Sequence, residues 1–392
     1  MKKANKLGSQ LQKYPAISDL RERAKKRLPH VSWEYLNMGT GEDQGKARNR
    51  EGLANVTLLP RFLKGQLDID LTTELFGRAY AAPFGVAPIG LTGLIWPRAE
   101  EILAKTAVKY TIPYTLSTVA TATPETIGPL VGNMGWFQLY PPRERDLRDD
   151  ILKRAKDSGF HTLVVTADVP APSRRQRVSR AGMQMPPQIT PRFLVQGALH
   201  PQWSIATLRH EIPRLKTLEK YTKSDELAAL ATFVRQKIGG TLSWEYLEEL
   251  RDAWDGPLVV KGILHPEDAK LAVEIGVDGI QVSNHGARQF DGTPAAIEAL
   301  PGIVDVVGES AAVIFDSGIR SGLDIIRALA LGADFVFLGR AFMYGVAAIG
   351  NSGGDHAVEV LLADLHANMH NIGVASIAEI KALEPLNNIR NA

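Results

Sequence analysis

A histidine and an arginine stand three residues apart in the segment SNHGARQ, which runs from 283 to 289. An imidazole accepts a proton near neutral pH, and a guanidinium group holds a carboxylate through two parallel hydrogen bonds. His285 and Arg288 could therefore act on one substrate, with His285 as general base and Arg288 as carboxylate ligand. A lone histidine is more often structural, but the neighbouring glycine and arginine at the end of an apolar run favour a catalytic site.

Two further charged residues end apolar runs. Asp168 ends HTLVVTAD, where its carboxylate could orient the imidazole and stabilise its protonated form; a helix cap or a turn is the alternative role. Lys261 ends PLVVK, and an amine there is costly to desolvate unless it meets an anion. A reduced flavin is such an anion, whereas a Schiff-base lysine and a solvated lysine at a rim are the competing interpretations.

Glycines and arginines follow the last two apolar runs, in DSGIR at 316–320 and in Gly339-Arg340. In barrels of alternating strands and helices, a phosphate often binds after the seventh and eighth strands. Glycine lets backbone N–H groups approach the anion, and arginine adds charge, so these segments predict a phosphate site. Dinucleotide binding is disfavoured because no GxGxxG opens a helix. No metal site is expected, because there is no HExxH and the histidines are scattered.

These residues stand at the ends of eight short segments rich in β-branched and aromatic residues. The segments are 83–90, 112–118, 134–140, 161–168, 256–263, 279–286, 311–318 and 334–341. Continuous apolar runs of this length are typical of parallel strands that are buried on both faces. Helical patterns lie between most of them, at 98–110, 144–158, 267–275 and 322–331. The alternation predicts an α/β fold, a (β/α)8 TIM barrel with its site at the carboxyl ends of the strands; an open doubly wound sheet is the alternative.

Two regions of the sequence are additional to the eight strands and helices of a minimal barrel. Roughly the first eighty residues form an N-terminal extension with a helix predicted at 19–28. About seventy residues, near 172–243, are inserted after the fourth strand, and between 174 and 223 they hold ten Lys/Arg against two Asp/Glu. This basic insertion fits a solvated loop or lid, or a contact with an anionic membrane surface or a redox partner. We expect one domain over 1–392, with the barrel at about 80–350.

The composition narrows the class of protein. The chain has no cysteine, which excludes disulfides, thiol nucleophiles and thiolate metal sites. A formal net charge of +2 gives no reason to expect a nucleic acid partner. The N-terminal lysines precede no apolar run, and no stretch approaches the length of a membrane-spanning helix. A cytoplasmic location is therefore expected, with peripheral contact at the inner membrane as the variant that the basic insertion suggests.

From about 28 to about 373, the sequence resembles the FMN-dependent L-2-hydroxy acid oxidase and dehydrogenase family. The likeness rests on SNHGARQFD, WFQLY, VVKGI, IFDSGIR and LGADFVFLGR, which occur in family order and at fitting spacings. The stretches LTGLIWPRAE and LHPQW are most similar to the bacterial lactate and mandelate dehydrogenase branch. The resemblance implies FMN-dependent oxidation of a lactate- or mandelate-like L-2-hydroxy acid to the 2-oxo acid.

The same resemblance implies roles for individual residues. His285 would be the catalytic base and Asp168 its partner, with Tyr140 and Arg288 also taking part in catalysis. The implied substrate ligands are Tyr35, Tyr140, Arg175, His285 and Arg288. The implied FMN ligands are Pro88, Ile89, Gly90, Ser117, Gln138, Thr166, Lys261, Ser283, Asp316, Ser317, Gly318, Arg320, Gly339 and Arg340.

The electron acceptor and the assembly also follow from the resemblance. A quinone or a cytochrome would reoxidise the flavin, with O2 and release of H2O2 as the alternative, and a homotetramer is expected. Val178 stands where many members have Asp, in the loop just after the fourth strand. Gly90 stands where many oxidases have Ala, and this glycine favours a dehydrogenase. An isomerase or a non-catalytic barrel that binds FMN or phosphate is the remaining alternative; Arg175 and Arg288 beside His285 argue against it.

Overall fold

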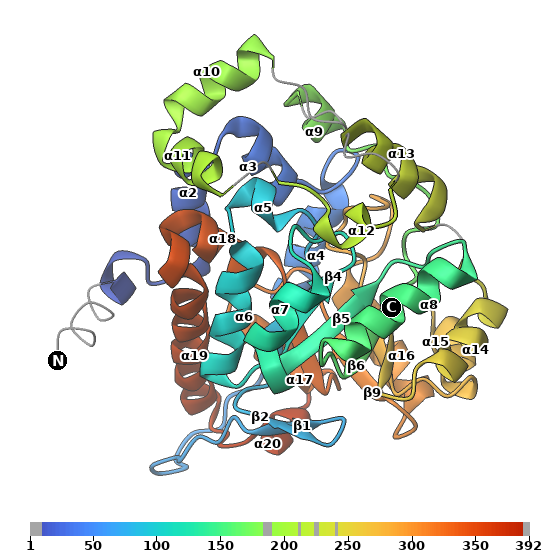
Figure 1. The fold of residues 1–392 in the computed structure, drawn as a ribbon. Coiled ribbons are helices and arrows are strands. Elements are labelled where there is room, and N and C mark those ends of the chain that lie inside the picture. The colour runs from blue at the N-terminus through green and yellow to red at the C-terminus, as the bar shows by residue number, and fades with distance from the viewer. Residues whose placement is uncertain (1–9, 183–189, 211–212, 223–226, 240–241, 387–392) are drawn as a thin grey trace.

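Eight parallel strands close into a barrel in the computed structural model, which describes residues 10–182, 190–210, 213–222, 227–239 and 242–386 (Figure 1). The strands are β3 (Phe84–Val86), β4 (Tyr114–Ser117), β5 (Gly135–Leu139), β6 (Thr162–Thr166), β7 (Leu258–Ile263), β8 (Gly279–Val282), β9 (Ala312–Phe315) and β10 (Phe335–Leu338). Each runs parallel to its neighbours, in the order β10-β3-β4-β5-β6-β7-β8-β9. Every predicted apolar run contains one of these strands. The TIM-barrel prediction is confirmed, and the open sheet is excluded.

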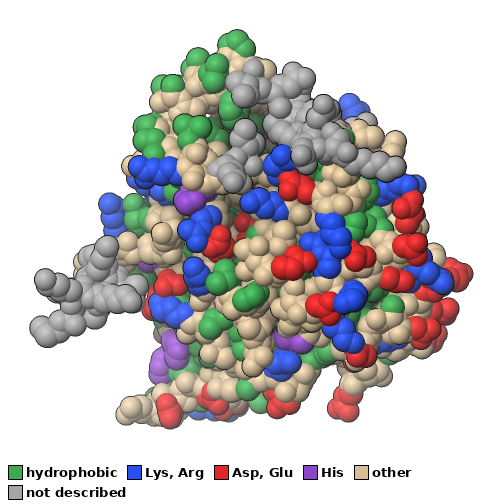
Figure 2. Space-filling model, in the orientation of Figure 1, with side chains coloured by type: hydrophobic (Ala, Val, Ile, Leu, Met, Phe, Trp, Pro, Cys, Tyr) green, Lys and Arg blue, Asp and Glu red, His purple; other side chains and the backbone are tan. Residues whose placement is uncertain are grey.

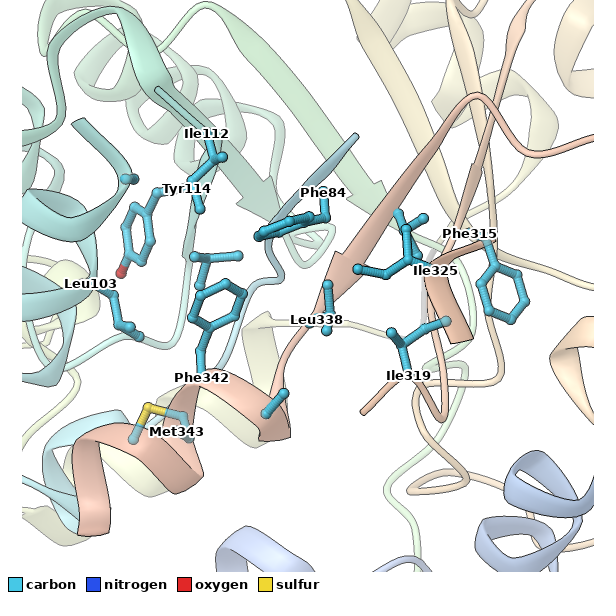
Figure 3. Packing of buried hydrophobic residues seen from close by; sticks show 14 of the residues in the cluster. Phe84, Leu103, Ile112, Tyr114, Phe315, Ile319, Ile325, Leu338, Phe342 and Met343 are labelled. Atoms are coloured by element: carbon cyan, nitrogen blue, oxygen red, sulfur yellow. The ribbon is translucent and has the colours of Figure 1, made fainter. Parts of the chain in front are cut away.

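Helices surround the barrel, and the four predicted ones are present with their ends shifted by about one residue. The outer helices are α6 (Ala99–Tyr110), α7 (Pro124–Val131), α8 (Arg145–Asp157), α14 (Trp244–Ala253), α15 (Pro266–Glu274), α16 (Ala296–Val307), α17 (Gly322–Ala330), α18 (Arg340–Ile349), α19 (Gly353–Ile372) and α20 (Ile377–Lys381). Their apolar faces pack on the strands. Phe84 of β3 and Phe342 of α18, for example, meet in this layer with ring centroids 6.5 Å apart (Figure 3).

An aromatic cluster fills the amino-terminal end of the barrel. Trp136 is fully buried, and its ring lies 4.9 Å from that of Phe337. A hairpin of β1 (Thr73–Leu75) and β2 (Arg78–Tyr80) covers this end, and the indole of Trp136 donates a hydrogen bond to the Tyr80 hydroxyl at 3.2 Å. The sequence did not predict this hairpin, because three-residue strands are too short for a periodic signal. With this end closed, only the carboxyl end can open into a site.

The N-terminal extension lies along one side of the barrel and over its open end (Figure 1). It contains α2 (Ile17–Arg27), which confirms the predicted helix, then α3 (His30–Asn37) and α4 (Gln44–Asn55). One face of α2 buries Ile17 and Leu20 and packs against α18. This packing holds the following helix, α3, at the mouth of the barrel.

The insertion after β6 contains several helices over its described residues and lies above the carboxyl ends of the strands (Figure 1). Its helices are α9 (Gln176–Arg180), α10 (Pro191–Leu199), α11 (Pro201–Arg209), α12 (Lys216–Glu219) and α13 (Leu227–Lys237). The parts of the predicted insertion at 183–189, 211–212, 223–226 and 240–241 lie outside the described residues. Among the described residues, no helix has the length and apolar character needed to cross a membrane.

Candidate active site

The carboxyl ends of the strands open into a cavity of about 620 Å³, whose walls include the extension and the insertion. Most of the predicted site residues line it: Tyr35, Pro88, Ile89, Gly90, Gln138, Tyr140, Thr166, Arg175, Lys261, His285, Arg288, Asp316, Ser317, Gly318, Arg320, Gly339 and Arg340. Three predicted residues do not line it. Ser117, Asp168 and Ser283 lie behind the wall and hold side chains that do.

His285 lies directly after β8 in a turn of unusual backbone. Three successive residues, His285, Gly286 and Ala287, have φ of 57°, 63° and 59°. This left-handed conformation is unfavourable for residues with a Cβ, so the surroundings must hold it. The Asn284 side chain accepts a hydrogen bond from the Ala287 amide at 3.1 Å, and the Ser317 hydroxyl accepts one from the Gly286 amide at 3.0 Å. The turn directs the imidazole into the cavity.

Asp168 orients that imidazole from the end of β6. The His285 Nδ1 atom lies 2.9 Å from Asp168 Oδ1. Burial disfavours the charged form of Asp168 and by itself would raise the pKa of the carboxyl. The nearby His285 and Lys261 have the larger effect and hold this pKa below its usual range. The carboxylate therefore accepts the proton of Nδ1, which leaves the lone pair of Nε2 as the acceptor. The Tyr140 hydroxyl lies 3.4 Å from this Nε2.

The titration of both groups suits proton transfer. Burial lowers the pKa of His285, and the charge of Asp168 opposes that shift only in part, so the imidazole is neutral near pH 7. Once it takes a proton, the adjacent carboxylate stabilises the imidazolium. Burial and the charge of Asp168 raise the pKa of Tyr140 to about 12, which keeps its hydroxyl protonated. The site thus presents one base and one donor side by side.

Two arginines, Arg175 and Arg288, line the same cavity as this pair. Burial, then the charge of Arg175, lowers the pKa of Arg288 to about 10. The Arg288 guanidinium lies 5.1 Å from the ring centroid of Tyr35, whose hydroxyl donates to the Gly90 carbonyl at 3.0 Å. Arg175 is held by Gln289, whose Oε1 accepts from Nη2 at 3.1 Å. Two neighbouring cations in a buried cleft repel each other, and an anion placed between them removes that cost.

A chain of buried hydrogen bonds forms one polar wall of the cavity. Ser117 donates to Gln138 Oε1 at 2.8 Å, and Gln138 Nε2 donates to Thr166 at 2.9 Å. Lys261 donates to Ser283 at 2.9 Å. Burial by itself would lower the pKa of Lys261. The carboxylates of Asp316 and Asp168 have the larger effect and raise this pKa, so Lys261 stays protonated in the wall of the cavity. This row of fixed donors matches the polar edge of a flavin ring, and the cation beside it suits a ring that becomes anionic on reduction.

The other end of the cavity is built for a doubly charged anion. Helix α18 begins at Arg340, and the residue before it, Gly339, supplies no side-chain cap, so the first N–H groups of the helix remain available to a ligand. Burial, then the charge of Arg288, lowers the pKa of Arg340 to about 9, and burial lowers the pKa of Arg320. Gly318 has φ of +96°, which glycine adopts readily. The donor set therefore fits a phosphate, and the two ends together fit FMN.

Several residues that the sequence did not identify individually also line the cavity. Leu215, Val234 and Ile238 come from the insertion, and none of them follows a strand of the barrel. Arg143 also lines the cavity, and its place just after β5 is a strand-end signal that could have identified it. Val178, at the position where Asp is common, is buried and lines the cavity as well. Apart from Arg143, these additional lining residues are apolar.

Comparisons with known proteins agree with this geometry. Residues 24–384 match the family described as FMN-dependent dehydrogenase. The chain is 41% identical to an L-lactate dehydrogenase of Ectopseudomonas mendocina, over 93% of this chain and 97% of that protein. It is 41% identical to an L-lactate dehydrogenase of Xanthomonas euvesicatoria pv. vesicatoria, over 94% and 95% of the two chains.

Solved structures of similar proteins agree with this family match. A crystal structure of (S)-mandelate dehydrogenase, described as a monotopic membrane protein, superposes with a TM-score of 0.89 at 33% identity and covers 95% of this chain and 99% of that one. A mandelate oxidase superposes with a TM-score of 0.80 at 33% identity, over 95% and 98% of the two chains.

Proposed function

We propose that this chain, which belongs to the FMN-dependent dehydrogenase family, oxidises a lactate- or mandelate-like L-2-hydroxy acid to the 2-oxo acid with His285 as the base. Its enzyme class, an FMN-dependent 2-hydroxy acid dehydrogenase or oxidase, follows from the family and its named relatives. The observation that carries the finer proposal is the His285–Asp168 pair, whose imidazole lines the same cavity as Arg175 and Arg288. The isomerase or non-catalytic alternative is a barrel that binds FMN or phosphate but lacks the carboxylate clamp, and the presence of Arg175 and Arg288 beside His285 in one cavity argues against it.

The cofactor would lie along the polar wall. Lys261, Gln138 and Thr166 would meet the ring, and Gly318, Gly339 and the arginines at 320 and 340 would hold the phosphate. When bound, FMN supplies the acceptor for the two electrons that leave the substrate.

The substrate would then be fixed by its carboxylate. Arg175 and Arg288 would hold the two carboxylate oxygens, and the hydroxyl of Tyr140 would bind the substrate oxygen. His285 Nε2 would remove a proton from the substrate, either from Cα or from the hydroxyl group. Asp168 would stabilise the resulting imidazolium, and the apolar walls from the insertion would exclude water.

Anaerobic reduction of the flavin tests this proposal. The purified holoenzyme is mixed without oxygen with lactate, glycolate, mandelate and longer L-2-hydroxy acids, and the flavin absorbance is followed. We expect at least one acid to bleach the flavin and to yield its 2-oxo acid. An unchanged spectrum with every acid, in a protein that carries FMN, would refute the proposed reaction.

The same preparation tests the electron acceptor, which we propose to be a quinone or a cytochrome. Two features support it: several named relatives are dehydrogenases, and residue 90 is glycine, as in the dehydrogenase branch that the sequence resembles. After reduction, a quinone analogue should reoxidise the flavin much faster than air. Rapid reoxidation by air with release of H2O2 would instead support the oxidase alternative.

We also propose that the insertion makes a peripheral contact with a membrane. Leu194, Leu199 and Leu208 on α10 and α11 are 60%, 72% and 84% exposed, with Arg192 and Arg209 beside them. Figure 2 shows hydrophobic side chains gathered at this end of the molecule. An exposed apolar patch with flanking cations is typical of helices that lie in a membrane interface. The structural relative described as monotopic supports the same interpretation.

Binding to vesicles checks this contact. Anionic vesicles should retain the protein at low salt, and replacing both Leu199 and Leu208 with Glu should abolish retention without loss of flavin reduction. Equal retention of the variant would contradict the proposal. Sedimentation of the released protein also measures its assembly, which we predict to be a homotetramer.

A further inference from the structure

The C-terminal end of α3 contacts one arginine that is proposed to bind the substrate and one that is proposed to bind the phosphate. Arg288 Nη1 donates to the Tyr35 carbonyl at 2.9 Å, and Arg340 Nη2 donates to the Met38 carbonyl at 2.7 Å. Lys46 Nζ donates to the Asn37 carbonyl at 3.1 Å. The last carbonyls of a helix lack partners within the helix and carry partial negative charge, so they hold cations well. The position of α3 therefore sets the position of two guanidinium groups that face the cavity.

Arg177 ties this helix to the insertion. Its Nε donates to Glu34 Oε2 at 2.6 Å, and its Nη1 pairs with Asp43. Asp43 is fixed in turn, because it accepts from the Gly39 amide at 2.7 Å and from Lys46 at 2.5 Å. Arg177 stands on α9, Glu34 stands on α3, and Asp43 precedes α4, so a single guanidinium group joins three segments.

These pairs are partly removed from solvent. The Glu34 side chain is 9% exposed and the Arg177 side chain 28%. Fully exposed ion pairs seldom fix a structure, whereas a planar guanidinium that uses two edges on two carboxylates fixes an orientation. The hydrogen bond to Glu34 and the charge of Asp43 outweigh burial and raise the pKa of Arg177. The guanidinium itself does not line the cavity, so any effect on the substrate must pass through its neighbours.

We infer that Arg177 is a positioning residue that brings Arg175 and Tyr35 to the same substrate carboxylate. Arg175 precedes Arg177 by two residues on the insertion, and Tyr35 follows Glu34 on α3. The Arg177 side chain bridges Glu34 and Asp43. This bridge therefore sets the distance between two substrate ligands that come from separate parts of the chain. The inference rests on the proposed function, which assigns Arg175 to the substrate carboxylate, and on the role of substrate ligand that the family resemblance implies for Tyr35.

Steady-state kinetics of three holoenzyme variants test the inference. R177Q should raise KM for the best 2-hydroxy acid by about 10- to 100-fold, the scale expected for a misplaced binding group, with a smaller change in kcat. Flavin content should stay at the wild-type level, because the proposed FMN ligands are untouched. R177K should recover part of the loss, since lysine keeps the charge but cannot bridge two carboxylates in the same way. R174Q is the matched control: Arg174 is exposed, its substitution removes the same charge next to Arg175, and KM should not change.

A double variant separates positioning from simple stability. R177Q leaves the buried Glu34 without its cation, and adding E34Q removes that charge, so R177Q/E34Q should regain thermal stability while KM stays raised. A wild-type KM in the double variant, or in R177Q itself, would overturn the inference.

Hydrogen exchange in the same holoenzymes gives a readout that does not depend on catalysis. The amides of α3 and α9 should exchange faster in R177Q than in R174Q, and equal exchange would also overturn the inference. If no 2-hydroxy acid reduces the wild-type flavin, the proposed reaction fails, and the exchange data still decide whether Arg177 holds α3 to α9.

Discussion

The two ends of the barrel each place a histidine beside a strand, and the two histidines differ in their partners. His161 precedes β6 at the closed end, with its Nε2 3.1 Å from the Asn133 carbonyl and its ring centroid 6.5 Å from that of Trp136. His285 follows β8 at the open end, with its Nδ1 2.9 Å from the Asp168 carboxylate. Burial lowers the pKa of both rings, in the case of His161 to about 4.

The partner decides what each ring can do. At His161 the nearby charge is Arg78, which lowers the pKa further and opposes protonation. At His285 the charge of Asp168 partly offsets burial, so a proton arriving at Nε2 meets a stabilising anion. Burial alone therefore gives a structural histidine, whereas burial with a carboxylate behind the ring gives a candidate base.

Removal of the imidazole should have the largest effect on flavin reduction at the open end and none at the closed end. H285Q should bind FMN but reduce it about 10²- to 10⁴-fold more slowly, because the general base is lost. H161Q, at the closed end, should reduce flavin at the wild-type rate. Stopped-flow mixing of each holoenzyme with substrate in the absence of oxygen measures both. Full retention of flavin reduction in H285Q would remove His285 from its proposed role.

Loss of the carboxylate should make His285 resemble His161. D168N keeps the size of the side chain but removes the charge that stabilises the imidazolium and selects the tautomer. We expect flavin reduction to slow by about 10- to 100-fold, the usual cost of losing an orienting partner. The same assay measures it, with flavin content as the control for folding. A wild-type rate would mean that Asp168 has only a local structural role.

The sequence predicted the strands and the strand-end residues, because a parallel strand buried on both faces is a continuous apolar run that turns polar where it meets the site. His285, Asp168, Lys261 and the phosphate segments all carry this signal. Tyr35 and Arg175 do not, since they come from the extension and the insertion, and only the family resemblance identified them.

Contacts between segments that are distant in the chain could not be predicted from the sequence. Arg177 and Glu34 are 143 positions apart, and nothing in either segment indicates the other. The same holds for Val234 and Ile238, which reach the cavity from a helix of the insertion. Such contacts depend on how the extension and the insertion pack together, and a single sequence carries no periodic pattern for that packing.

A smaller effect is expected in the pH dependence of kcat/KM. The base must be neutral to accept a proton, so kcat/KM should fall as the pH drops through the pKa of His285. Because burial lowers that pKa, the midpoint should lie below the ordinary value of 6.5. D168N removes the charge that raises it, so its residual activity should show a midpoint at still lower pH. A midpoint at or above 6.5 in the wild type, or an upward shift in D168N, would contradict this account.

His161 should instead affect stability. Its pKa is about 4 in the folded protein and near 6.5 when unfolded, so its contribution is complete above pH 6.5 and is lost as the pH falls toward 4. The ring keeps some contact with solvent, which limits the effect to about 1–2 kcal/mol. Urea unfolding between pH 4 and 7 should therefore show a smaller decrease in stability at low pH for H161Q than for the wild type. The kcat/KM profile of H161Q should keep the wild-type midpoint, and a shifted midpoint would show that the two ends of the barrel are coupled.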